Sequence, residues 1–416
     1  MSRRKFLKQI GVLAGAATTV PALSAIHKEG KKMPMKIGVL VPQNKSVIGL
    51  GDSFVNGLRL FQEKHKEKWT EDVEFIVESY TLSSSSIIGK SQKLIFENMV
   101  DMVVAHTSTL FLSTIRDLYH DNEKFLLVSD IGAKVGNYIP TSPFIYTNSL
   151  NLWQSSYAMG NWAGKNLGKT SVIVSSFYDS GFDNTGMFYK GFEEAGGENK
   201  GFLMLDPPNA SVNPKALINQ IETINPELIF ANFSGSDAVI FANAFLNSHL
   251  NGKIPMVANP FMLDEQLQHR INGNMDGVKS AFSWTPEMNH AANKEFIKDA
   301  TAKYGKEPGV FELLGYECAM ILDSAIKHNG NNANKEDFSK AMADVKINGP
   351  RGIVKMDRQS HFTNADICLR SMTKDGFNFV NKPIADQLAY VSEDDDGVRK
   401  DFSGLISGWQ NPYLTE

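Results

Sequence analysis

Cysteine is scarce in this 416-residue chain, which contains only Cys318 and Cys368. Two cysteines exclude a disulfide framework, and they lack the spacing of a zinc site. A single disulfide between them would require their Cα atoms to come within about 7 Å. The sequence leaves open whether the fold pairs them or keeps two separate thiols.

An excess of charge of one sign is also absent. The chain has 42 basic and 46 acidic residues, which gives a net charge of −4 at pH 7. This balance argues against nucleic acid or an anionic membrane surface as a partner. A content of 42% hydrophobic and 21% charged residues is ordinary for a globular protein, and the length predicts two domains or three.

Short motifs of enzyme chemistry are missing from the sequence. There is no G-x-G-x-x-G after an expected strand, no phosphate-binding P-loop, no H-E-x-x-H, no C-x-x-C and no G-x-S-x-G. His106 stands alone at an expected strand end, where a hydrogen-bonded structural role is the simplest interpretation. Catalytic triads can assemble from distant residues, so these absences argue against an enzyme without excluding one. We expect no cofactor and no metal.

The N-terminus has the pattern of an export signal. A basic segment, residues 1–8, precedes a short apolar stretch at 10–20 and a small-residue end at 21–25. This order defines a secretory signal, and the apolar stretch is shorter than the roughly 20 residues that span a membrane. We expect residues 1–25 to be removed near Ser24 or Ala25 and the mature protein to act in the periplasm.

The pair Arg3-Arg4 closely resembles the twin-arginine export motif, which implies export after folding. An ordinary secretory signal with a chance Arg-Arg pair is the alternative. No cysteine lies at the cleavage region, so we expect no lipid anchor there.

The mature chain alternates short apolar strands with amphipathic helices. The first group has expected strands at 35–41, 73–77, 101–105 and 125–129 and helices at 52–66, 83–96 and 109–119. The second group has strands at 143–147, 171–176, 202–205, 228–232 and 255–258 and helices at 153–167, 184–195, 214–224 and 237–246. Such alternation predicts parallel sheets with helices on both faces, and its repetition predicts two α/β lobes of one architecture.

The last third of the chain follows a different pattern. An extended segment at 278–283 precedes three expected helices at 291–304, 310–328 and 335–344. Further strands are expected at 352–356, 367–373 and 387–391.

Several segments together resemble the leucine/isoleucine/valine-type binding proteins, the branched-chain amino acid binding family of ABC importers. They are the opening strand Lys36-Ile-Gly-Val-Leu-Val-Pro42 with Gly51-Asp52 and Asn56-Gly57, the loop Ala105-His-Thr-Ser-Thr109, Asp179-Ser-Gly181, the helix end Gly191-Phe-Glu-Glu-Ala-Gly-Gly197, Gly315-Tyr316-Glu317, and the turn Asn348-Gly-Pro-Arg-Gly352. Each motif is weak alone, whereas their order and spacing over 36–357 are specific.

The resemblance implies a type I periplasmic binding fold, with two doubly wound parallel-sheet lobes joined by three hinge crossings near Thr147, Ser283 and Gly352. The N-lobe would combine 35–147 with 284–350, and the C-lobe 148–283 with 351–416. The resemblance also implies capture of a small molecule, an amino acid or an organic acid, for an ABC permease in the membrane. We expect a monomer; a receptor that feeds a signalling partner is the alternative, because one fold serves several functions.

Candidate ligand-binding residues follow the expected strands, because ligands of open α/β sheets sit beyond the carboxyl ends of the strands. Helix N-termini there offer unpaired N–H groups and a partial positive charge to a carboxylate. The first-lobe candidates are Leu50, Thr107, Ser108, Thr109, Asp130, Gly132 and Ala133. The second-lobe candidates are Tyr178, Asp179, Ser180, Phe233, Ser234 and Phe261.

Some of these residues have other possible roles. The hydroxyls of residues 107–109 could bind a carboxylate or only cap the following helix. Asp130 could pair with a ligand ammonium or cap a turn, and the aromatic candidates could line a cleft or fill the lobe core. An exported hydrolase of similar architecture would need an activated nucleophile, for which Ser108 and Ser180 are the first candidates.

One position departs from the family pattern. Amino acid binders of the family usually have an acidic residue after the strand that corresponds to 255–258, whereas this chain has Asn259-Pro260-Phe261. An unpaired ammonium in a closed site is costly. An α-amino acid ligand would therefore need Asp130 or Asp179 as a substitute, and a carboxylate without an amine, aromatic or not, becomes a real alternative.

Overall fold

The structure is a computed structural model that describes residues 34–43, 49–66, 72–133, 140–177, 179, 183–205, 213–329, 334–376 and 378–390. All of them belong to one structural unit, Pro34–Glu416. The expected export signal at 1–25 and the candidates Tyr178 and Ser180 lie outside the described residues.

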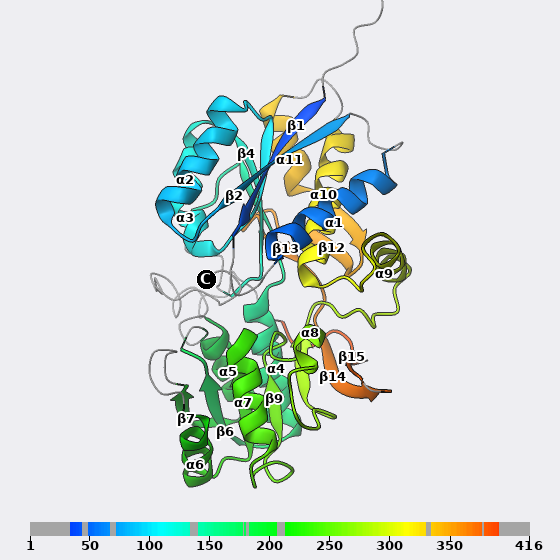
Figure 1. Cartoon of the computed structure of the whole chain (residues 1–416). Helices are drawn as coiled ribbons and strands as arrows, with labels where there is room; N and C mark the ends of the chain where they lie inside the picture. The colour runs from blue at the N-terminus through cyan, green and yellow to red at the C-terminus, as the bar shows by residue number, and fades with distance from the viewer. Residues whose placement is uncertain are drawn as a thin grey trace, which may run out of the picture. The chain divides into compact units, whose positions relative to one another are not determined.

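The first sheet has five parallel strands in the order β2-β1-β3-β4-β5. Its strands β1, β2 and β4 are labelled in Figure 1. They are β1 Met35–Pro42, β2 Val73–Tyr80, β3 Met102–His106, β4 Phe125–Asp130 and β5 Ile145–Ser149. Successive side chains of a strand point to opposite faces. Accordingly, Val39 packs in one apolar cluster and its neighbour Leu40 in another. Both faces of this sheet are therefore buried, as a doubly wound lobe requires.

Helices cover each face of the first sheet. The Val39 face packs against α1 Leu50–Lys64, α9 Ala291–Tyr304, α10 Val310–Asn329 and α11 Lys335–Ala343. The Leu40 face packs against α2 Ser84–Gln92, its π-helical continuation η1 Lys93–Glu97, and α3 Thr109–Asp121. Residues 291–343 thus return to the first lobe after the chain has built the second.

The second sheet has seven strands in the order β15-β14-β10-β9-β8-β6-β7. They are β6 Thr170–Ser175, β7 Glu198–Met204, β8 Leu228–Asn232, β9 Met256–Ala258, β10 Lys279–Phe282, β14 Cys368–Asp375 and β15 Asn378–Ala385. Its helices are α4 Leu152–Asn166, α5 Asp183–Glu194, α6 Pro214–Ile224, α7 Gly235–Leu246 and the short α8 Glu265–Gln268. Apolar residues of α4 and α5 pack with Phe230, whereas those of α6 and α7 pack with Ile229, so this sheet is also covered on both faces. The expected α/β class with two doubly wound lobes is confirmed.

A small third sheet and a hairpin complete the fold. Antiparallel β11 Lys346–Gly349, β12 Gly352–Met356 and β13 Thr363–Asn364 form the third sheet. The strand expected at 387–391 is wrong: β15 ends at Ala385 and pairs antiparallel with β14. The turn signal Asp375-Gly376, with Gly376 at a φ of 61°, ends β14 and starts this hairpin.

Each lobe contains one pair of helices that touch through glycine. In the first lobe, a Cβ on Gly57 of α1 would overlap the carbonyl oxygen of Glu312, and one on Gly315 of α10 would overlap that of Phe54. In the second lobe, Gly160 of α4 faces the carbonyl oxygen of Phe188 in the same way. Only glycine lets two helix backbones come this close.

Both cysteines are buried free thiols, Cys318 on α10 and Cys368 on β14. The alternative of two separate thiols is therefore the one that the structure shows. Burial raises the pKa of Cys318 to about 12 and that of Cys368 to about 11, so both stay protonated near neutral pH.

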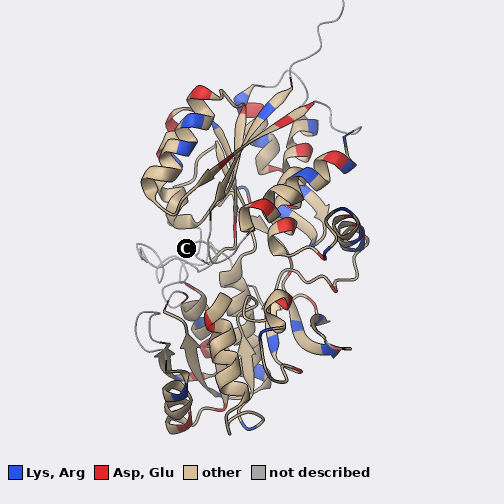
Figure 2. Ribbon diagram, in the orientation of Figure 1, with Lys and Arg blue, Asp and Glu red and all other residues tan. Residues whose placement is uncertain are grey.

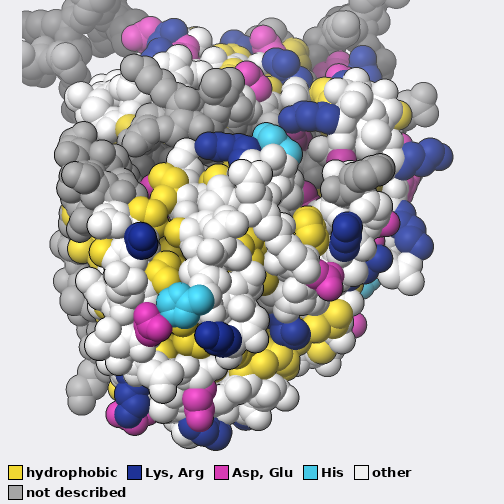
Figure 3. All heavy atoms as spheres, turned by 60° about the horizontal axis from the view of Figure 1, so that its bottom comes forward, with side chains coloured by type: hydrophobic (Ala, Val, Ile, Leu, Met, Phe, Trp, Pro, Cys, Tyr) yellow, Lys and Arg dark blue, Asp and Glu magenta, His cyan; other side chains and the backbone are white. Residues whose placement is uncertain are grey.

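Charges of both signs are interspersed over both lobes (Figure 2). The face of the second lobe that Figure 3 brings forward likewise has apolar side chains between charged ones of both signs. In the described part of the chain, no helix is both long and apolar enough to cross a membrane, and no group of three His, Cys, Asp or Glu side chains could hold a metal ion.

Candidate functional site

The end of β3 brings two candidate residues of the first lobe against the end of β4. Ser108 is the N-cap of α3, and its hydroxyl accepts a hydrogen bond from the Phe111 N–H at 3.4 Å. Thr109, the first residue of α3, donates from Oγ1 to Asp130 Oδ2 at 3.5 Å. Of the two roles left open for these hydroxyls, the structure shows helix capping for Ser108, and Thr109 and Asp130 lie together at the α3 N-terminus.

Asp130 ends β4 with its side chain removed from solvent, at 2% exposure. Burial raises the pKa of this carboxyl to about 6, and hydrogen bonding by Ser149, Gly132 and Thr109 offsets part of that rise. The carboxyl can therefore hold a proton at mildly acidic pH and either donate or accept a hydrogen bond.

Thr107 and His106 serve the structure of the first lobe. The fully buried Thr107 accepts a hydrogen bond at its hydroxyl from the Tyr80 hydroxyl at 3.0 Å. His106 stacks on Phe54, and its Nδ1 lies 3.2 Å from Ser129 Oγ. Burial lowers the pKa of His106 to about 4, which keeps the ring neutral. The hydrogen-bonded structural role predicted for this histidine is confirmed.

Gly132 and Ala133 lie in the loop after β4, where the first lobe contacts the second. Gly132 has a φ of 66°, and a Cβ there would lie only 2.5 Å from Ser149 Oγ. The carbonyl oxygen of Ala133 accepts a hydrogen bond from the N–H of Asp183, the first residue of α5, at 3.2 Å. This backbone bond places the loop after β4 directly beside the second lobe.

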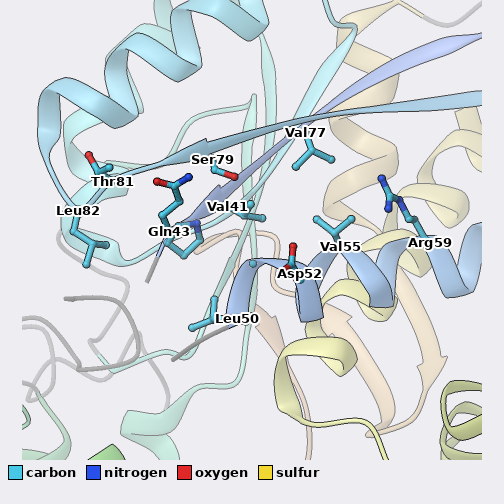
Figure 4. Close-up of a pocket in the computed structure, with 13 residues that line it drawn as sticks. Val41, Gln43, Leu50, Asp52, Val55, Arg59, Val77, Ser79, Thr81 and Leu82 are labelled. Carbon is cyan, nitrogen blue, oxygen red and sulfur yellow. The ribbon is translucent and has the colours of Figure 1, made fainter. Parts of the chain in front are cut away.

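Leu50, the remaining first-lobe candidate, is the buried first residue of α1. It lies at one end of a cavity of about 710 Å³ between α1 and the edge of the first sheet (Figure 4). In Figure 4, Asp52 and Arg59 of α1 point toward β2, whereas Leu50 points away from that strand.

Asp179 and Ser234 meet at the ends of β6 and β8 in the second lobe. Ser234 Oγ donates to Asp179 at 3.0 Å, and Ser176 Oγ donates to Asp179 Oδ2 at 2.8 Å. Asp179 is fully buried, and burial raises the pKa of its carboxyl to about 7 against the offsetting hydroxyl bonds. Each lobe thus has one buried carboxyl with a raised pKa at its strand ends.

Phe233 fills the lobe core and does not line a cleft; these were the two roles left open for the aromatic candidates. Its ring is fully buried and stacks on Phe241 of α7 at 4.5 Å between centroids. This places it in the apolar core between the second sheet and α6 and α7.

Phe261 lines a hollow of about 220 Å³ formed by segments of both lobes. Its walls include Phe282, Trp284, Glu307 and Arg370. None of these four residues belongs to the candidates predicted from the sequence. Arg370 was detectable as the one charged residue of the expected strand at 367–373. Its guanidinium donates to Ser280 Oγ, Trp284 O and Pro260 O.

Among the residues that the structure describes, no base is hydrogen-bonded to the Ser108 hydroxyl. Its hydroxyl bonds the Phe111 N–H, whereas the nearby His106 bonds Ser129. An activated serine needs a base within hydrogen-bond reach. Ser180, the other candidate nucleophile, lies outside the described residues.

Two doubly wound lobes, with polar residues at the strand ends and contact between them, define a two-lobed ligand-binding protein. Residues 34–376 match the family described as "Periplasmic binding protein", and the chain belongs to this family. The predicted family resemblance is therefore confirmed, and the match extends beyond residue 357, where the resemblance was expected to end.

Among curated proteins, the chain is similar to Leu/Ile/Val-binding protein homolog 6 of Brucella melitensis, with 23% identity over 91% of this chain and 96% of the relative. Among solved structures, it resembles a solute binding protein of an ABC transporter from Rhodopseudomonas palustris in complex with 3,4-dihydroxy benzoic acid, with a TM-score of 0.76, 22% identity and coverage of 88% and 99% of the two chains. An ABC transporter substrate-binding protein from Sphaerobacter thermophilus gives a TM-score of 0.79, 22% identity and coverage of 86% and 99%.

Proposed function

We propose that this protein captures a small carboxylate-bearing ligand in the periplasm and delivers it to an ABC permease, without performing chemistry on it. The N-lobe, 35–147 with 284–350, closes on the C-lobe, 148–283 with 351–416. A ligand that contacts both lobes only in the closed form shifts the population toward that form, which a permease can recognise. A receptor that passes the same closure to a signalling partner is the second candidate.

The observation that carries this proposal is the polar group at the N-terminus of α3. Ser108 and Thr109 lie where the helix has unpaired N–H groups and a partial positive charge, which favour a carboxylate. Asp130 adjoins Thr109, and the Ala133 carbonyl meets α5 of the second lobe. A carboxylate bound at α3 would therefore lie at the junction of the lobes.

The second lobe favours a ligand without an amine. Asn259 stands where amino acid binders of the family usually have an acidic residue, and it is 1% exposed. Both ends of its side-chain amide are already hydrogen-bonded within the protein: Nδ2 donates to Asn232 Oδ1 at 2.7 Å, and Oδ1 accepts from the Phe261 N–H at 2.9 Å. An ammonium would then depend on Asp130 or Asp179, and burial disfavours the charged form of both. Aromatic walls at Phe261, together with the dihydroxybenzoate bound by the Rhodopseudomonas palustris neighbour, support an aromatic acid over leucine.

A thermal-shift series tests the ligand class, because a ligand bound only by the folded state raises the melting temperature. We expect stabilisation by 3,4-dihydroxybenzoate or benzoate and little by leucine. Stabilisation by leucine alone would show that an acidic side chain pairs with the amine after all. No stabilisation by any carboxylate would contradict the proposed function.

The Thr109→Ala variant tests the site. Loss of a hydrogen bond to a charged ligand group costs about 1.5–3 kcal/mol, so affinity should fall by about 10- to 100-fold in calorimetric titration with the stabilising acid. Thr114→Ala on the same helix is the matched control, since its hydroxyl only bonds the Leu110 carbonyl. Equal affinities of the two variants would remove Thr109 from the site.

A further inference from the structure

One buried ion pair lies where the two lobes connect. Arg351 and Glu317 have side chains only 1% and 0% exposed, with Nη2 2.6 Å from Oε2. The Arg351 Nε donates to both carboxylate oxygens at 3.0 Å. Glu317 lies on α10, and Arg351 lies in the turn between β11 and β12.

The other Arg351 donors reach the segments that link the sheets. Nη1 donates to the Ser149 carbonyl at 3.0 Å and to Ser283 Oγ at 3.3 Å, and Nη2 donates to Asn148 Oδ1 at 3.0 Å. Ser149 ends the last strand of the first sheet, and Ser283 follows β10 of the second. Arg351 itself lies just before β12, from which the chain continues through β13 to β14 of the second sheet. The guanidinium of Arg351 therefore bonds the first two of these connections, and Arg351 itself lies at the start of the third.

Neighbouring hydrogen bonds extend this cluster toward the ligand-site candidates. Thr363 Oγ1 donates to Asn148 Oδ1 at 3.0 Å and accepts from the Ser149 N–H at 2.9 Å. Ser149 pairs in register with Asp130, and its Oγ fills the space beside Gly132. A shift of Arg351 would thus be transmitted to the loop after β4.

We infer that Arg351 and Glu317 are positioning residues that restrict the angle between the lobes and so set the free energy of closure. A buried ion pair seldom makes a protein more stable than an apolar pair of similar size would. The five N–H donors of a guanidinium, however, fix the positions of the groups that they bond. Here the fork bonds three segments that are far apart in the chain, a geometry that specifies orientation. The inference rests on lobe closure in the proposed function but does not depend on ligand identity.

The test measures the distance between lobes by single-molecule energy transfer in the ligand-free protein. Asp121→Cys on α3 and Gln220→Cys on α6 provide exposed labelling sites, while Cys318 and Cys368 are buried. In Arg351→Met/Glu317→Met, where both charges are removed, we expect a distance distribution about twofold broader with an unchanged melting temperature. If the closed form becomes tenfold rarer, affinity for 3,4-dihydroxybenzoate falls about tenfold.

Two further variants make the outcome decisive. Arg358→Met/Asp344→Met removes an exposed ion pair and should leave the distribution unchanged. Ser283→Ala removes only the bonds from Arg351 Nη1 and to the Leu150 carbonyl, and should broaden it in the same direction. The inference is overturned if the distance distribution of Ser283→Ala is as narrow as that of the natural chain and the Arg351→Met/Glu317→Met variant, where it folds, also shows no broadening. Broadening without binding of any carboxylate would support it while refuting the proposed ligand.

Discussion

The Asp179→Asn variant is expected to gain stability over the natural chain as the pH rises. The Asp179 carboxyl is fully buried, and its pKa is about 7 in the folded protein against an ordinary value of 3.8. Between these values the folded state binds the proton more tightly than the unfolded state, so the stability of the natural chain falls as the pH increases. Asparagine does not titrate, so the stability of the variant does not decrease with pH for this reason.

The size of the effect follows from the separation of the two pKa values. Each pKa unit corresponds to about 1.4 kcal/mol, so full ionisation costs the natural chain about 4 kcal/mol. Between about pH 5 and about pH 8 the difference in unfolding free energy between variant and natural chain should grow by about 3 kcal/mol.

Urea unfolding at these two pH values measures the effect. Asp121→Asn, which removes an exposed acid on α3, controls for the loss of one negative charge. The reasoning is refuted if the Asp179→Asn difference is the same at both pH values, because the carboxyl would then ionise equally in the folded and unfolded chain.

Three other substitutions test the remaining roles. Phe233→Ala should cost about 3–5 kcal/mol in urea unfolding while ligand affinity stays unchanged, because the ring packs in the core; weakened binding without loss of stability would instead place it in the site. Gly160→Ala should lower the melting temperature, since the added methyl group overlaps the Phe188 carbonyl oxygen and overpacking costs about 1–3 kcal/mol of stability. An unchanged melting temperature would show that α4 and α5 can separate. Replacing Arg3 and Arg4 with lysine should trap the protein in the cytoplasm on cell fractionation, and undiminished export would indicate an ordinary secretory signal.

The sequence was sufficient to predict the lobes because their core elements follow simple periodicities. In β1 the neighbouring apolar residues Val39 and Leu40 point to opposite faces and are both buried, which needs helices on both sides of the sheet. The meeting of Thr109 and Asp130 was also predictable, since Thr109 follows β3, Asp130 ends β4, and these two strands pair directly. Parallel neighbours end at the same edge of a sheet, so adjacent strand ends bring their loops together.

Side-chain direction at the strand ends could not be predicted from the sequence. Phe233 and Ser234 are consecutive, yet the ring enters the core and the hydroxyl bonds Asp179. The direction of each depends on how the chain turns into α7, and composition does not encode that turn. The β14–β15 hairpin was missed because Pro383 weakens the strand signal; an edge strand such as β15 tolerates proline, since its outer N–H groups need no partner.

The glycine contacts within each lobe have a mechanical consequence. Where α1 meets α10, and again where α4 meets α5, backbone touches backbone and leaves no deformable side chain between them. Neither helix pair can slide without breaking that fit, so each lobe should move as a solid block. Any bending of the molecule must then be absorbed as dihedral rotation in a few connecting residues, and a single substitution among those residues could retune the motion while both blocks stay intact.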